Sequence, residues 1–99
     1  PVFYGHAEAI HIELRQPLSA EDIKNVLETA PGVVLMADDA DYPTQVTHAS
    51  GKDETFVGRI REDISHPNGI NLWVVADNTR KGAATNSIQI AELLVADYL

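Results

Sequence analysis

Histidine is the residue of this sequence best suited to acid/base chemistry, because its imidazole titrates near neutral pH. Four histidines occur in the 99 residues. His6 follows Gly5 at the start of an alternating apolar pattern, and by that alternation it shares the buried face of Ile10. Two interpretations remain open from the pattern: a core histidine bonded to a backbone carbonyl, or a general acid/base.

The other histidines do not form a pattern of metal ligands. No two of the four have the i, i+4 spacing of ligands on one helix face, and His11 alternates to the opposite face from His6. His48 and His66 fall in loop and turn sequence, where we expect them to be solvated. The absence of cysteine excludes disulfides, thiolate ligands and a cysteine nucleophile within these residues. We therefore predict no metal site.

A polar junction near residue 78 is the second candidate site. The sequence ADNTRKGAATN joins an apolar strand pattern to the start of a helix, and it lacks the GxxxxGK pattern of a phosphate loop. Asn78 at this junction offers a donor and an acceptor to a ligand amide. A turn residue or a helix cap at this position would have the same sequence, so that alternative stays open.

Two further groups have roles that the residues leave open. Pro1 is a secondary amine, and it is either a base or nucleophile or simply the residue exposed by removal of an initiating Met. Arg59 and Arg61 alternate to one strand face beside Glu62 and Asp63. Cross-strand ion pairs and a carboxylate or phosphate clamp are both consistent with that pattern.

The elements that would position these residues follow from the hydrophobic periodicity. A helix over 18–32 is marked by Ser19 as N-cap and by Asp22 three residues later, and Pro31 and Gly32 end it. Its predicted apolar stripe consists of Ile23, Val26, Leu27 and Ala30. The expected strands are 5–15, 33–36, 55–64 and 69–78, with the last two forming an antiparallel hairpin.

A long surface loop over 37–54, with a brief strand near Gln45–Thr47, and a long helix over 80–99 complete the predicted order. This β-α-β-loop-β-β-α order predicts the α+β class, with a largely antiparallel or mixed sheet and helices on one face. The last helix has a broad apolar arc, which suggests contact on more than one side.

Composition narrows the functional classes. The chain is 44% hydrophobic and 22% charged, as expected for one globular domain or part of a larger one. Its net charge of −8 disfavours binding to nucleic acids or to anionic membranes. There is no apolar run of about 18 residues and no signal-peptide pattern, so we expect a cytoplasmic protein.

Three long stretches carry a resemblance to a known family. GHAEAIHIEL, GKDETFVGRIREDISHPNGINLWVVADN and RKGAATNSIQIAELL closely resemble the C-terminal part of bacterial aspartate-semialdehyde dehydrogenases. The resemblance covers nearly the whole chain and is weakest over LMADDADYPTQVTHAS. It implies a segment of a catalytic domain like that of glyceraldehyde-3-phosphate dehydrogenase. Residues 1–79 would be the C-terminal part of the dimerisation/catalytic domain, and residues 80–99 a helix that packs on a nucleotide-binding domain.

The resemblance also implies chemistry. Family members interconvert aspartate semialdehyde plus phosphate and aspartyl phosphate through a cysteine thioester, with NADP as cofactor, in lysine, threonine and methionine biosynthesis. By the match, His6 is the catalytic acid/base and Asn78 is the cofactor-binding amide. The implied partners are the small-molecule substrate, a second copy in a homodimer and the rest of the same enzyme. That remainder comprises the nucleotide-binding domain and the cysteine-bearing segment.

In the family, a substrate-binding arginine stands two residues before the proline that corresponds to Pro1. Because this arginine, the nucleophile and most of the cofactor site lie outside these residues, we expect the 99 residues alone to be inactive as a dehydrogenase. We also expect them to self-associate, because the hairpin and the last helix carry more apolar surface than one small core is expected to bury. Two other readings of the function stay open: a non-catalytic dimerisation fragment or paralogue, and a related reductase of the N-acetylglutamyl-phosphate type.

Overall fold

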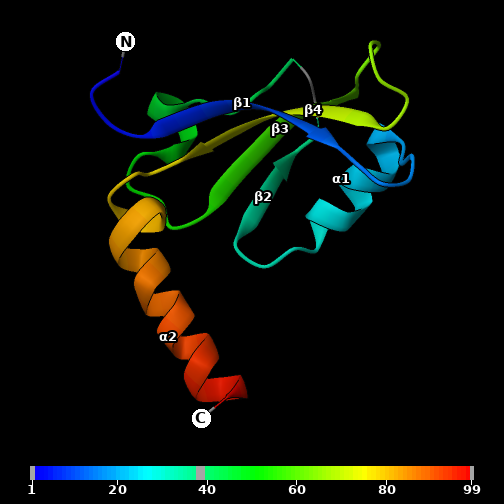
Figure 1. The fold of residues 1–99 in the computed structure, drawn as a ribbon. Helices are drawn as coiled ribbons and strands as arrows, with labels where there is room; N and C mark the ends of the chain where they lie inside the picture. The colour runs from blue at the N-terminus through cyan, green and yellow to red at the C-terminus, as the bar shows by residue number, and fades with distance from the viewer. Residues whose placement is uncertain (1, 38–39, 99) are drawn as a thin grey trace.

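The computed structural model describes residues 2–37 and 40–98. A four-stranded mixed sheet forms the centre of the fold (Figure 1), with the strand order β1-β4-β3-β2. The strands are β1 (His6–Glu13), β2 (Val33–Met36), β3 (Thr55–Glu62) and β4 (Gly69–Ala76). The helical elements are α1 (Ala20–Glu28), η1 (Gln45–Ala49), η2 (Arg80–Ala84) and α2 (Thr85–Asp97). This arrangement confirms the predicted α+β class.

Strand pairing agrees with the predicted hairpin and places β1 at an edge of the sheet. β3 and β4 are antiparallel, and β1 runs antiparallel to β4 along its whole length, from His6 opposite Ala76 to Glu13 opposite Gly69. β2 pairs with β3 in the parallel direction and forms the other edge. This register places the start of β1 beside the end of β4.

The sheet has an apolar core on each face. On one face Val57, Ile60, Ile70 and Leu72 are buried beneath apolar side chains of α1. On the opposite face Ala49 of η1 packs with Phe56 and Val75. The expectation of helices on one face was wrong, because α1 and η1 pack on opposite faces and α2 projects away from the sheet (Figure 1).

A β-bulge changes the alternation predicted for β3. The pairing with β4 shifts between Gly58 and Arg61, and Arg59 has a φ of +52°. The extra residue reverses the side-chain parity beyond it. Ile60 consequently joins the core of Val57, although the sequence pattern placed it on the face of Phe56.

The capping signals of α1 are confirmed. The Ser19 side chain accepts from the Asp22 N–H, and the Asp22 carboxylate accepts from the Ser19 N–H. Ile23 and Leu27 pack against the core as predicted. The inclusion of Val26 in the apolar stripe was wrong, because its side chain is 64% exposed. The apolar stripe by which α1 contacts the sheet is therefore narrower than the predicted stripe.

The segment before β3 differs from its prediction as a surface loop with a brief strand. Residues Gln45–Ala49 form a π-helical turn, in which the Ala49 N–H donates to the Thr44 carbonyl and the Thr47 N–H donates to Thr44 Oγ1. Pro43 and Ala49 are buried, and the Trp73 Nε1–H donates to the Pro43 carbonyl. The segment lies against a sheet face because it supplies part of the core.

Helix α2 continues from η2 and confirms the predicted C-terminal helix. None of its 13 residues is buried. Its exposed large apolar residues are Ile88, Ile90, Leu93, Leu94 and Val95, followed by Tyr98 just beyond the helix. Over residues 2–37 and 40–98, no helix has the length and apolar composition needed to cross a bilayer.

Candidate functional site

The structure brings the two predicted site residues to the same corner of the sheet. His6 is the first residue of β1 and pairs with Ala76, the last residue of β4. Asn78 follows β4 by two positions. The Gly5 N–H donates a hydrogen bond of 3.0 Å to Asn78 Oδ1, across 73 positions of sequence. Asn78 therefore contacts the residue immediately before His6.

The side chain of His6 is exposed, so the expectation that it lies on a buried face was wrong. The alternation itself is correct, since Ile10 on the same parity packs against the core. Burial fails at His6 because α1 contacts β2 and β3 and lies near the opposite end of β1 (Figure 1). An exposed imidazole at a strand end is accessible to a reactant.

Gly5 has a conformation and surroundings that require glycine. Its φ of +92° lies in a region that residues with a Cβ rarely adopt. A Cβ at this position would lie 3.0 Å from Gln45 Cβ and 3.4 Å from the Ala76 carbonyl oxygen. The chain before His6 is thus held closely between the π-helical turn and the end of β4.

Asp77 organises the junction, and sequence analysis missed it. Its side chain is buried, with 7% relative exposure. Oδ2 accepts from the Gly51 N–H at 2.7 Å, and Oδ1 accepts from the Thr79 N–H, Thr79 Oγ1–H and Arg80 N–H at 2.8–3.0 Å. The signal was present as Asp-x-Thr at a helix start, a typical pattern of carboxylate capping.

These donors stabilise the ionised carboxylate. The hydrogen bond from the Gly51 N–H, followed by those from Arg80 and Thr79, holds the pKa of Asp77 far below its ordinary value. The same junction is tied to the preceding loop by Arg80, whose Nε–H donates to Asp53 Oδ1 at 2.7 Å. Thr85 Oγ1–H donates to the same oxygen at 3.0 Å. Asn78 therefore sits in a turn that is held from both sides.

The other histidines do not join this site. His11 Nδ1 lies 3.0 Å from Asn71 Oδ1 and 3.1 Å from Asp63 Oδ2, towards the far end of β1. The hydrogen bond to Asn71, and next that to Glu13, raises the pKa of His11. His66 lies 3.8 Å from Glu13 in the same cluster.

The prediction of solvated histidines in the loop and the turn was only partly right. His66 is half-buried, and its Nδ1 accepts from the Asn68 N–H. His48 is also half-buried, with its ring 5.8 Å from the Phe56 ring. His48 is thus covered by a residue of β3, whereas His66 is covered by its own turn and by Glu13 at the end of β1. Among residues 2–37 and 40–98, no group of three or more His, Asp or Glu side chains could hold a metal ion.

Arg59 and Arg61 make contacts that the sequence pattern did not anticipate. The guanidinium carbon of Arg59 lies 5.7 Å from the centre of the Tyr42 ring, within the range of a cation–π interaction. Arg61 donates through Nη1 to the Arg59 carbonyl at 2.6 Å. Both contacts hold the bulged part of β3. Pro1, the other group with an open role, lies outside the described residues.

Comparisons with known proteins agree with the resemblance noted in the sequence. Residues 1–81 match the family described as "Semialdehyde dehydrogenase, dimerisation domain". Aspartate-semialdehyde dehydrogenase of Shewanella violacea is 62% identical over 98 residues, which are 99% of this chain and 29% of that protein. Aspartate-semialdehyde dehydrogenase 2 of Vibrio cholerae is 64% identical, again over 98 residues and 29% of its length.

Solved structures give the same result for the fold. The crystal structure of aspartate semialdehyde dehydrogenase II from Vibrio cholerae has a TM-score of 0.91 and 63% identity, and the match covers 99% of this chain and 29% of that one. A probable aspartate-semialdehyde dehydrogenase from Pseudomonas aeruginosa has a TM-score of 0.87 at 40% identity. The chain spans about 29% of the length of these relatives. Its match to the dimerisation domain over residues 1–81 shows that the chain belongs to the semialdehyde dehydrogenase family.

Proposed function

We propose that the chain is the C-terminal segment of an aspartate-semialdehyde dehydrogenase and contributes the acid/base residue of its active site. The observation that carries this proposal is the position of His6. Its exposed imidazole lies at the start of β1, beside the polar junction that contains Asn78. The high identity to named aspartate-semialdehyde dehydrogenases supports the choice of reaction.

His6 would move the proton in this reaction. An aldehyde carbon that is oxidised while bound to a thiol must lose the proton of its oxygen, and a neutral imidazole is a suitable base for it. The thiol would come from a cysteine in another part of the enzyme, because these 99 residues contain none. Phosphate would then attack the carbonyl carbon of the resulting thioester, which breaks the carbon–sulfur bond, releases the cysteine thiolate and yields aspartyl phosphate.

Asn78 would hold the cofactor, for which we propose NADP. A nicotinamide cofactor, when bound, supplies the hydride acceptor. Asn78 is half-buried, and its carbonyl oxygen already accepts from Gly5. The group that it can offer to a ligand is therefore the amide N–H, which suits an acceptor such as the oxygen of a carboxamide. The residues at this corner are compatible with the cofactor.

We further propose that residues 1–79 belong to the dimerisation/catalytic domain of a homodimer and that residues 80–99 pack on the nucleotide-binding domain. The exposed apolar side chains of α2 support the second statement. Ile88 and Val95, on one side of the helix, are 60% and 66% exposed. A helix with this much apolar surface in water gains stability when another element covers it.

The test is the replacement of His6 in the full-length enzyme that contains this segment. We expect His6→Ala to lower kcat for aspartate semialdehyde by about 10²–10⁴, the usual contribution of a positioned acid/base. The melting temperature should stay close to that of the wild type, because the side chain is exposed. His11→Ala, which removes an exposed histidine from the far end of β1, serves as the matched control for kcat. Full turnover in His6→Ala together with a lower melting temperature would show that His6 has only a structural role.

A further inference from the structure

The peptide group between Tyr4 and Gly5, which carries the Gly5 N–H, is held by a side chain instead of by strand pairing. The backbone ladder of β1 and β4 ends at His6 and Ala76. Beyond that pair, β4 enters the turn at Asp77, and the Gly5 N–H finds its acceptor in Asn78 Oδ1 at 3.0 Å. The amide oxygen of Asn78 thus extends the ladder by one hydrogen bond, at the residue next to the candidate base.

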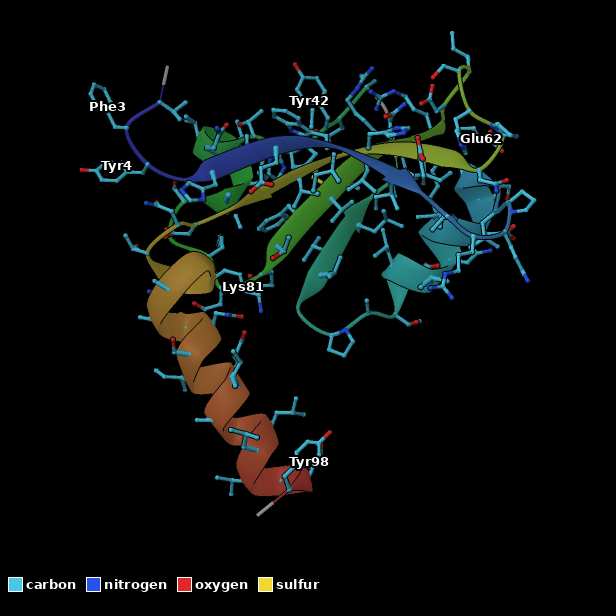
Figure 2. The ribbon with its side chains drawn as sticks, viewed as in Figure 1. Phe3, Tyr4, Tyr42, Glu62, Lys81 and Tyr98 are labelled. Carbon is cyan, nitrogen blue, oxygen red and sulfur yellow. The ribbon has the colours of Figure 1, made fainter. Side chains whose placement is uncertain are left out.

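Other contacts restrain this part of the chain weakly. The side chains of Phe3 and Tyr4 are 97% and 73% exposed, and Figure 2 shows both pointing away from the sheet. Gly5 itself has a wide range of accessible backbone conformations because it lacks a Cβ. The hydrogen bond to Asn78 and the close approach of Gln45 therefore determine the direction from which the chain reaches His6.

Asn78 is held in turn by its neighbour. The buried carboxylate of Asp77 accepts four hydrogen bonds, from Gly51, from the backbone and side chain of Thr79, and from Arg80. Hydrogen bonds to an ionised group are stronger than neutral ones and hold their geometry better. The backbone on both sides of Asn78 is consequently rigid, and its side chain projects from a fixed point.

We propose that Asn78 is a positioning residue for His6. It acts through its hydrogen bond to Gly5, which we call the clamp, and Asp77 supports the clamp by fixing the turn that carries Asn78. Asn78 would orient the strand end through Oδ1 while its amide N–H remains the group offered to the cofactor. This inference rests on the proposed role of His6 as acid/base. It extends that role, because loss of Asn78 should then affect the chemical step as well as cofactor binding. A displacement of about 1 Å in a catalytic group can reduce the rate by two orders of magnitude.

The experiment compares Asn78→Ala, Asn78→Asp and a control in the full-length enzyme. Asn78→Ala removes both the acceptor and the donor, whereas Asn78→Asp keeps an acceptor oxygen for Gly5 and removes the donor. Asn71→Ala is the matched control, because Asn71 lies at the other end of β4 and contacts His11. Hydrogen–deuterium exchange of the peptide carrying Gly5 reports on the clamp without any cofactor.

We expect Asn78→Ala to accelerate exchange at Gly5 and to lower kcat at saturating NADP by about tenfold or more. Asn78→Asp should restore slow exchange and raise only the KM for NADP, and Asn71→Ala should change neither quantity. If Asn78→Ala keeps slow exchange and the wild-type kcat while the KM rises, Asn78 binds the cofactor alone and the clamp is refuted. If His6→Ala keeps full turnover, the proposed function fails, while the exchange result still decides whether the clamp exists.

Discussion

Replacement of Gly5 by alanine tests whether the backbone before His6 is held as tightly as the structure indicates. A φ of +92° is unfavourable for a residue with a Cβ, at a cost of about 1–2 kcal/mol. The new Cβ would also lie 3.0 and 3.1 Å from Cβ and Cγ of Gln45. Carbon atoms prefer about 3.5–4.0 Å, so Gln45 or the Gly5 backbone must move by several tenths of an ångström.

This crowding adds about 1–3 kcal/mol, the usual range for overpacking, to the cost of the backbone conformation. We therefore expect Gly5→Ala to reduce the free energy of unfolding by about 2–5 kcal/mol in total. Because the strain falls on the peptide that leads into His6, we also expect kcat to fall by about 10- to 100-fold.

The matched control is Gly32→Ala, which has a similar φ of +75° but only the flexible end of Lys81 at 3.6 Å from the new Cβ. It should cost about 1–2 kcal/mol and leave kcat unchanged. The assay combines thermal unfolding of the full-length enzyme with steady-state turnover of aspartate semialdehyde. The reasoning is refuted if the two alanine variants lose equal stability and both keep the wild-type kcat.

The core and the histidine cluster give two further predictions. Ile70→Ala, at a side chain with 1% exposure, should destabilise the protein by about 2–5 kcal/mol in denaturant unfolding, whereas Val26→Ala on the exposed side of α1 should change stability by less than about 0.5 kcal/mol. The raised pKa of His11, caused first by Asn71 and then by Glu13, means that the folded state favours the protonated imidazole. This stabilisation is complete below the unfolded pKa near 6.5 and is lost as the pH rises through the higher folded pKa. A His11→Gln variant should therefore have a lower melting temperature than the wild type at pH 5.5 and nearly the same one at pH 8.5. An equal loss at both pH values would contradict this prediction.

Elements with local signals were predicted well from the sequence. The reciprocal hydrogen bonds of Ser19 and Asp22 mark the start of α1, and the alternation of 55–64 and 69–78 gives the β3–β4 hairpin. These features depend on residues within a few positions of each other, so periodicity and capping chemistry are sufficient. The resemblance to semialdehyde dehydrogenases also lay in the sequence alone, because three long stretches carry it.

Features that depend on packing were not predictable in this way. A π-helical turn over Gln45–Ala49 replaces the brief strand predicted near Gln45–Thr47, because Thr44 and the burial of Ala49 stabilise the turn. The bulge at Arg59 moves the Ile60 side chain to the other face of the sheet. The sequence does not predict this change, because an extra residue in a strand leaves no mark in an alternating pattern.

The sequence by itself determined most helix and strand segments and the α+β class, and it predicted His6 and Asn78 as candidate site residues. Only the tertiary structure decided that Asn78 contacts Gly5, the residue immediately before His6. The antiparallel register of β1 and β4 brings residues 73 positions apart within one hydrogen bond, and the side chain of Asp77 fixes the turn that presents Asn78. The exposure of His6 was also a tertiary outcome, because it depends on which end of β1 the helix α1 covers. Pairing register and coverage arise from contacts distant in sequence, and local periodicity carries no information about them.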